Sequence, residues 1–249
     1  MVVAPRGYRA QADGAGTVFV PEPPVPGAPV VGLAPVETAE EGPLDPETLL
    51  PAALPGWRPV GAWSRTTAGT TGTGAGFRSW QADVQGPPGA EPAVLGVLLL
   101  TLASGGSARL LWAVGNPAQA VLEGEPLLRI LHAAAAELPP GEPPDLRGAW
   151  LDHNAGGSVQ YRFGAEGSLL RELVATTSFA TSERTTTTYR DGDYRMAGGE
   201  LVLRAGGVAE RFQVRVFDEF GYGAQTPLHL LGLLPRDGGP ELTYARLEG

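Results

Sequence analysis

Apolar and polar residues alternate along residues 146–249 in short runs that end at glycine or aspartate. In the run over 159–163, Val159, Tyr161 and Phe163 share one face, and two polar residues share the other. Because successive side chains of a β-strand point to opposite faces, this period of two predicts strands with one buried face. Further runs of this kind are 201–203, 212–216 and 228–230, with turns predicted at 165–167 and 191–192.

About eight such strands in sequence order predict an all-β, up-and-down barrel, which removes sheet edges by closing on itself. The apolar faces of the strands would then line the interior. The residues predicted there are Trp150, Tyr161, Phe163, Leu201, Leu203, Phe212, Val214 and Leu228. An interior of this composition has no charge to orient a polar substrate, so it predicts a hydrophobic guest.

The same segment opens with Leu146-x-Gly148-x-Trp150 and continues through GDYR, from Gly192, to a GGELVL run. With its Asp/Glu-x-Gly turns between aromatic-rich strands, it resembles the small bacterial lipocalin-like barrels. The resemblance implies an architecture and a place for a ligand inside it, but no particular ligand, because such barrels differ in what they hold. The disulfide known from secreted lipocalins does not carry over, since the chain has no cysteine.

Residues 1–138 mix strand and helix patterns, which predicts an α+β domain with an antiparallel sheet. Asp45 before Pro46 predicts the start of a helix, with the aspartate as N-cap, and Pro51 should keep this helix short. A second helix is expected in two parts, beginning at 116 and 125. The expected strands are a hairpin over 7–22, a strand over 28–36, strands at 57–65 and 76–84 around a Thr/Gly-rich loop, and a buried hairpin over 93–114.

This order of hairpin, helix, antiparallel meander and closing helix is similar to that of the Mog1/PsbP-like α/β sandwich domains. The resemblance implies a protein partner for this domain and no catalytic residues. The segment 137–145 contains four prolines, which favour an extended spacer. We therefore expect two domains, 1–138 and 146–249, joined by a Pro-rich linker over 139–145.

Composition excludes many kinds of chemistry. The chain has no cysteine, and all 18 of its basic residues are arginine. It therefore has no thiolate nucleophile, iron–sulfur cluster or Cys-based zinc site, and no lysine for a Schiff base or a Walker A loop. A formal net charge of −9 argues against nucleic acid as a partner, because phosphate binding needs clustered cations.

The longest apolar run, 93–103, is too short to span a bilayer, and the N-terminus shows no signal peptide. We expect a cytoplasmic protein, or a secreted one if a leader has been removed.

Several local motifs resemble functional sites, and each has a simpler interpretation. The Thr/Gly-rich segment 66–76 lacks the spacing of a dinucleotide fingerprint and predicts a loop. Asp191-x-Asp193 begins like a calcium loop, but Arg195 occupies the next ligand position, so a hairpin turn is expected. The segment 218–223 predicts an inter-strand loop, and 185–188 an exposed strand. His132, His153 and His229 have no ligand spacing, and His229 is expected to face outward.

Because cysteine and lysine are missing and the three histidines are dispersed, we predict no metal and no cofactor. No nucleophile elbow is present, so we predict no catalytic residue. Three functional hypotheses remain. The first is a non-enzymatic binding protein whose barrel holds a small hydrophobic molecule. The second is an interaction or assembly module whose barrel is filled by its own side chains. The third is a hydrolase or isomerase without a visible motif. Large residues meeting at the centre of the barrel would favour the second hypothesis over the first.

Overall fold

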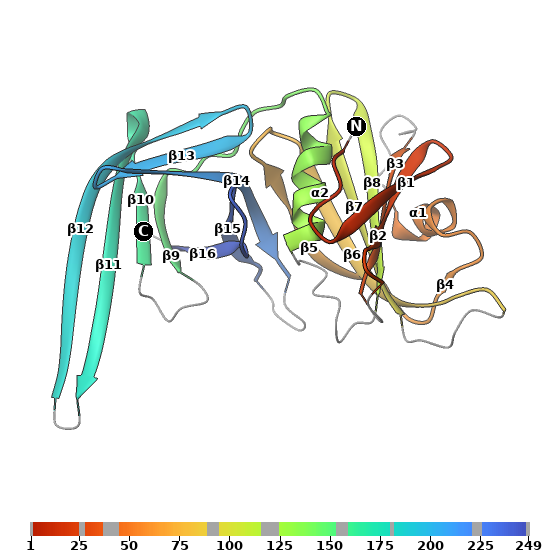
Figure 1. The fold of residues 1–249 in the computed structure, drawn as a ribbon, viewed down its shortest axis with the longest axis horizontal. Helices are drawn as coiled ribbons and strands as arrows, with labels where there is room; N and C mark the ends of the chain where they lie inside the picture. The colour runs from red at the N-terminus through yellow and green to blue at the C-terminus, as the bar shows by residue number, and fades with distance from the viewer. Residues whose placement is uncertain are drawn as a thin grey trace. The chain divides into compact units, whose positions relative to one another are not determined.

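The chain divides into two compact units. In a computed structural model, residues 2–24, 28–36, 45–88, 95–115, 125–152, 159–179, 182–220 and 226–247 are described. Unit 1 comprises residues 1–69 and 74–142, and unit 2 comprises 70–73 and 143–249. Most described residues lie in β-strands, and the described part contains two α-helices, both in unit 1 (Figure 1).

Unit 1 is built on one sheet whose strands follow the order β1-β2-β3-β8-β7-β6-β5, with β4 paired to β6. The expected hairpins are confirmed, because β1 pairs with β2 and β7 with β8, both antiparallel. The strands are β1 (Tyr8–Asp13), β2 (Gly16–Pro21), β3 (Val30–Val36), β4 (Arg58–Pro59), β5 (Ser64–Thr71), β6 (Gly76–Gln85), β7 (Leu95–Ser104) and β8 (Ser107–Gly115).

The predicted Thr/Gly-rich loop is largely a strand, so that prediction was wrong. Residues 66–71 belong to β5, and only 72–75 form the connection to β6. Threonine is β-branched and fits a pleated surface well, which outweighs the local glycine content. Ser79 of β6 further ties this strand in place, because its hydroxyl accepts the backbone N–H of Thr67 at 2.9 Å.

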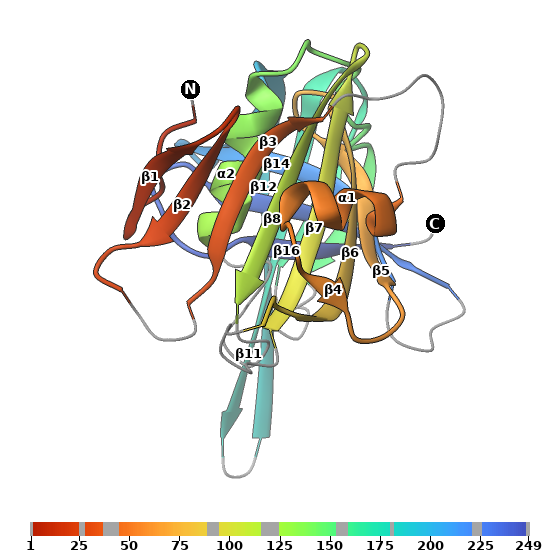
Figure 2. The same cartoon turned by 90° about the vertical axis from the view of Figure 1, so that its right-hand side faces the viewer.

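The two helices cover opposite faces of this sheet (Figure 2). Helix α1 (Pro46–Ala53) starts as predicted, with the Asp45 side chain accepting the N–H of Glu47. Pro51 lies inside this helix, which ends two residues later. Helix α2 (Glu125–Ala136) buries the apolar residues of its repeat, whereas its expected first part, 116–124, lies outside the described residues. The core under α1 contains Leu49, Leu50, Leu54, Val84, Leu110 and Val114.

Unit 2 is a closed eight-stranded antiparallel barrel. Each strand pairs with the next along the chain, and the last returns to the first, as the sequence predicts for an up-and-down barrel. The strands are β9 (Gly148–Asp152), β10 (Val159–Phe163), β11 (Ser168–Phe179), β12 (Ser182–Ala197), β13 (Glu200–Ala205), β14 (Val208–Glu219), β15 (Leu228–Pro235) and β16 (Leu242–Leu247).

Strands β11 and β12 extend beyond the rest of the barrel as a two-stranded ribbon (Figure 1). The pairing of β11 with β10 ends at Leu173, and the pairing of β12 with β13 begins at Gly192. Beyond these points, 174–179 pair with 182–187, and 188–191 pair with 170–173. Among the described residues, neither helix is long and apolar enough to cross a membrane.

Candidate functional site in the barrel interior

All but one of the residues predicted for the barrel interior lie together in one buried cluster. The strand registers place them on one face, because Trp150 lies opposite Tyr161 and Leu201 opposite Phe212. The predicted members of the cluster are Trp150, Tyr161, Phe163, Leu201, Leu203, Phe212 and Val214.

Leu228 is the exception, and its prediction was wrong. Its side chain is 48% exposed, whereas Leu231 and Leu233 of the same strand belong to the buried cluster. The inward face of β15 therefore carries the odd-numbered residues. Leu230 and Leu234 on the opposite face are buried as well. Because β15 is apolar on both faces, alternation alone could not select the inward one.

Side chains fill the interior at the level of this cluster. Trp150, Leu201 and Val214 retain no exposed surface, and the other predicted members retain between 1% and 4%. A side chain that lined a cavity large enough for water would keep exposed surface. The rings also touch one another: the centroids of Phe163 and Tyr194 are 4.9 Å apart, edge to face. The predicted interior residues therefore form a packed core at this level.

Two tyrosines place hydroxyl groups inside this core. The ring centroids of Tyr161 and Tyr244 are 5.1 Å apart, and their hydroxyls are hydrogen-bonded to each other. Burial is the largest cause of the raised pKa of each phenol, because it disfavours the charged phenolate.

An ion pair also lies on the inward face, so the expectation of an interior without charge was wrong. Arg171 lies opposite Tyr161 in the register, and its Nη1 is 3.2 Å from Oε2 of Glu210. The Arg171 side chain is 24% exposed, and its Nε is buried without a hydrogen-bond partner. Arg171 continues the inward series that starts at Leu169, and this spacing was the sequence signal that could have found it.

A second polar group lies at the other end of the barrel, beside Trp150. His229 Nδ1 is 2.8 Å from Asp218 Oδ1, and its Nε2 is 3.4 Å from Nη1 of Arg246. The centroid of the His229 ring is 5.6 Å from that of Trp150. His229 thus shares the inward face of β15, contrary to the expectation that it faces outward. Because both ring nitrogens of His229 have a partner, we assign this residue a structural role.

Arg215 alternates with the inward residues of β14, so the period of two predicts it on an exposed outer face, but it is buried. Its guanidinium forms a two-point ion pair with Glu241, with nitrogen–oxygen distances of 2.7 and 2.8 Å. The two side chains are 3% and 8% exposed. Gly232 lies opposite Arg215 on β15, and a Cβ at this glycine would collide with the Glu241 carboxylate. The missing side chain of Gly232 therefore leaves the space that the ion pair occupies.

The remaining candidate motifs also serve the fold. Asp191 and Asp193 lie inside β12, so the predicted turn at 191–192 was wrong; the reversal is made by Gly198 and the glycine after it, both with positive φ. Asp218 belongs to β14 and not to a loop.

His132 is buried in α2, whereas His153 and 221–223 lie outside the described residues. The described part of the chain holds no group of three or more side chains arranged to bind a metal.

The chain matches no protein-family model and no curated protein. The functional proposal therefore depends on the geometry alone.

Proposed function

We propose that this protein is a non-enzymatic interaction module whose barrel is filled by its own side chains. The packed cluster of aromatic and aliphatic residues carries this proposal, because a guest at that level would have to displace buried side chains. Opening such a core would expose apolar surface to water, which costs a free energy of about 25 cal/mol per Å². A filled barrel is instead a rigid support for whatever binds at its outside.

The β11–β12 ribbon supplies the binding surface in this proposal. In the described part of the chain, β12 has no further strand beside it from Ser182 to Asp191. Exposed strand edges are commonly protected by charged side chains, above all lysine, by proline or by a bulge. The charged residues of this edge are at its two ends, Glu183 and Arg184 at one and Arg190 and Asp191 at the other. The segment from Ser182 to Asp191 contains neither lysine nor proline, and its pairing with β11 runs without interruption. The edge can therefore accept another strand.

The register identifies which residues face the free edge. Ala197 and Glu200 flank a two-residue turn, so they form a hydrogen-bonded pair, and odd-numbered residues of β12 direct their backbone groups toward β13. Continuing this alternation along the ribbon, Thr187 and Tyr189 direct their N–H and C=O groups toward the open side. Both are exposed, and Tyr189 is 61% exposed.

The partner we propose is an extended protein segment that is rich in β-branched or aromatic residues and has no strong net charge. Strand addition provides affinity through the backbone, and the threonine-rich edge suits β-branched neighbours. Residues 182–191 carry two arginines, one glutamate and one aspartate, so the edge has no net charge on a chain with a net charge of −9. A neutral edge favours a neutral segment over a strongly charged one.

Peptide selection from a phage library, with the full chain as bait, tests this proposal. We expect selected peptides to bind wild-type protein and to lose at least about tenfold in affinity with Thr187→Pro, which removes one outward N–H. Thr187→Val keeps that N–H and should bind like wild type. If no peptide is enriched, or if Thr187→Pro binds as well as Thr187→Val, the ribbon is not the binding surface.

A barrel that binds a small hydrophobic molecule stays a second candidate, favoured by one observation. Arg171 Nε has no hydrogen-bond partner and lies at a partly exposed end of the interior. A guest with an acidic head group could bind there only if the cluster opened. The fluorescent probe 1-anilinonaphthalene-8-sulfonate has this chemistry. The filled-barrel proposal expects no saturable uptake by the native protein, and stoichiometric uptake would reverse the ranking.

The finer parts of the assignment are also proposals. The lipocalin-like assignment of unit 2 is supported by its strictly sequential strand order. The Mog1/PsbP-like, α+β assignment of unit 1, which implies a protein partner there, is supported by its hairpin, helices and meander. A cytoplasmic location, and the absence of an enzymatic activity, are proposed on the sequence alone.

A further inference from the structure

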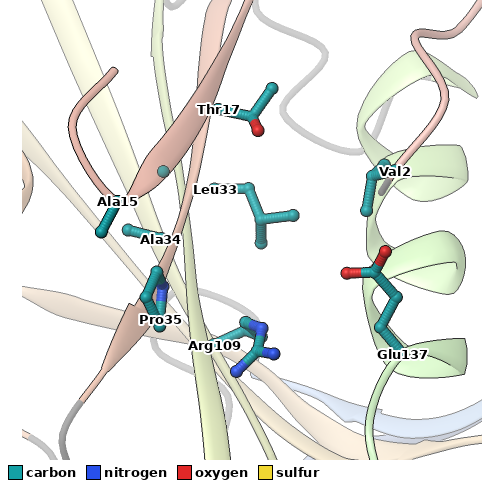
Figure 3. A pocket seen from close by; sticks show the side chains of 9 residues that line it. Val2, Ala15, Thr17, Leu33, Ala34, Pro35, Arg109 and Glu137 are labelled. Atoms are coloured by element: carbon teal, nitrogen blue, oxygen red, sulfur yellow. The ribbon is translucent and has the colours of Figure 1, made fainter. Parts of the chain in front are cut away.

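Unit 1 contains a pocket of about 180 Å³ that the filled-barrel proposal does not use. The pocket lies beside β2, β3 and β8 and the C-terminal end of α2 (Figure 3). A volume of this size corresponds to about six water molecules in the liquid. It therefore suits a small molecule rather than a lipid chain or a peptide. Its lining includes Val2, Thr17, Leu33, Pro35, Arg109 and Glu137.

One wall of the pocket carries a cation. Arg109 lies in β8, and its Nη1 donates a hydrogen bond to the carbonyl of Ala108 at 3.0 Å. A guanidinium has five N–H donors in a planar fork, which matches the geometry of a carboxylate. The bond to Ala108 uses one of these donors, so the group can still bind an anion.

The opposite wall carries a carboxylate at the end of a helix. Glu137 directly follows α2, and the last turn of this helix contains no basic residue. The C-terminal end of a helix carries partial negative charge, so it favours a cation nearby and disfavours the Glu137 carboxylate. A bound ammonium group would be stabilised both by this carboxylate and by the end of the helix. Because a carboxylate accepts several hydrogen bonds, this role does not require that Glu137 lack other partners.

Apolar side chains lie between the two walls. Leu33 and Val2 are each 7% exposed, and Figure 3 shows the Leu33 side chain directed into the pocket with Val2 on the α2 side. We propose that this pocket binds a small aliphatic zwitterion of the amino-acid type. Its carboxylate would bind Arg109, its ammonium would bind Glu137 and the end of α2, and its apolar part would contact Leu33.

Three compounds with the same branched apolar body test this proposal. Leucine carries both charged groups, 4-methylpentanoate lacks the ammonium group, and isoamylamine lacks the carboxylate. Each is titrated into the full chain and followed by the backbone amide shifts of residues around the pocket. We expect saturable binding of leucine, and binding of each half-molecule that is weaker by about tenfold or more.

Two charge-removing variants separate the roles of the walls. Leucine should bind to the Arg109→Gln variant only as well as isoamylamine binds to the wild type. It should bind to the Glu137→Gln variant only as well as 4-methylpentanoate binds to the wild type. Arg9→Gln, at a side chain 59% exposed, is the matched control and should change nothing. Thermal melts of all variants establish that they fold. The proposal is overturned if leucine does not bind, or if it binds no better than the half-molecules. It is also overturned if both variants weaken the binding of leucine and of both half-molecules by the same factor.

Discussion

Tyr161 and Tyr244 show how single residues shape the barrel interior. Both rings are nearly fully buried, and each hydroxyl has the other as its partner. A buried hydroxyl without a partner would cost about 1–3 kcal/mol, so the pair is a matched unit in the apolar cluster.

These two phenols should make stability fall at alkaline pH. Their pKa values are raised by burial in the folded chain, whereas in the unfolded chain they ionise near pH 10. The contribution of the two protonated phenols to the free energy of unfolding is thus complete below about pH 10. It is lost as the pH rises toward their pKa in the folded state. Above pH 10 the free energy of unfolding should fall by up to about 1.4 kcal/mol per pH unit for each tyrosine.

Urea unfolding between about pH 9 and pH 11 measures this slope. The double variant Tyr161→Phe/Tyr244→Phe removes both hydroxyls together, so it should leave no unsatisfied group and should flatten the slope. Tyr189→Phe, at an exposed position, is the control and should leave the slope unchanged. An equal slope in the double variant would show that other groups cause the alkaline loss.

At the scale of elements, β12 depends on a close approach of two backbones. Gly192 is the first residue of β12 that pairs with β13, and a Cβ at this position would collide with the carbonyl oxygen of Arg204. The glycine that suggested a turn in the sequence therefore allows a continuous strand to pass from the ribbon into the barrel.

Gly192→Ala should consequently destabilise the protein by about 1–3 kcal/mol, because the collision involves backbone that cannot move independently. Gly61→Ala is the matched control, since a Cβ there meets no heavy atom within 4 Å. Both are compared by denaturant unfolding. If Gly192→Ala is as stable as the control, the strands can separate at this point without cost.

At the scale of the whole molecule, the division into two units can be tested by limited proteolysis. Units 1 and 2 meet in the sequence between Glu142 and Pro143, and Pro139, Pro140 and Gly141 just before this point are exposed. Exposed segments with few partners are the preferred sites of cleavage.

A broad-specificity protease should therefore cut first within 139–145 and leave two stable fragments. Because residues 70–73 group with unit 2, the fragments must be separated under denaturing conditions and identified by mass. First cuts inside either half, or resistance of the whole chain, would contradict the boundaries 1–138 and 146–249.

Local patterns in the sequence were enough for most of the strands, for the hairpins β1–β2 and β7–β8, and for the closed barrel. The period of two in β10 and β14, and the Asp45-Pro46 start of α1, act over a few neighbouring residues and so can be read without a structure. The order of the barrel strands follows from short connections, which favour pairing of consecutive strands.

Only the tertiary structure decided which face of β15 is inward. It also decided that Arg171 pairs with Glu210 inside the barrel, and that Arg215 pairs with Glu241 in the space left by the missing side chain of Gly232. These outcomes depend on register and on partners from distant parts of the chain. The pocket beside α2 has the same origin, because β8 and the end of α2 meet there only through folding. Alternation places a residue on a face, but burial of that face and the partner of each charge are set by packing between strands.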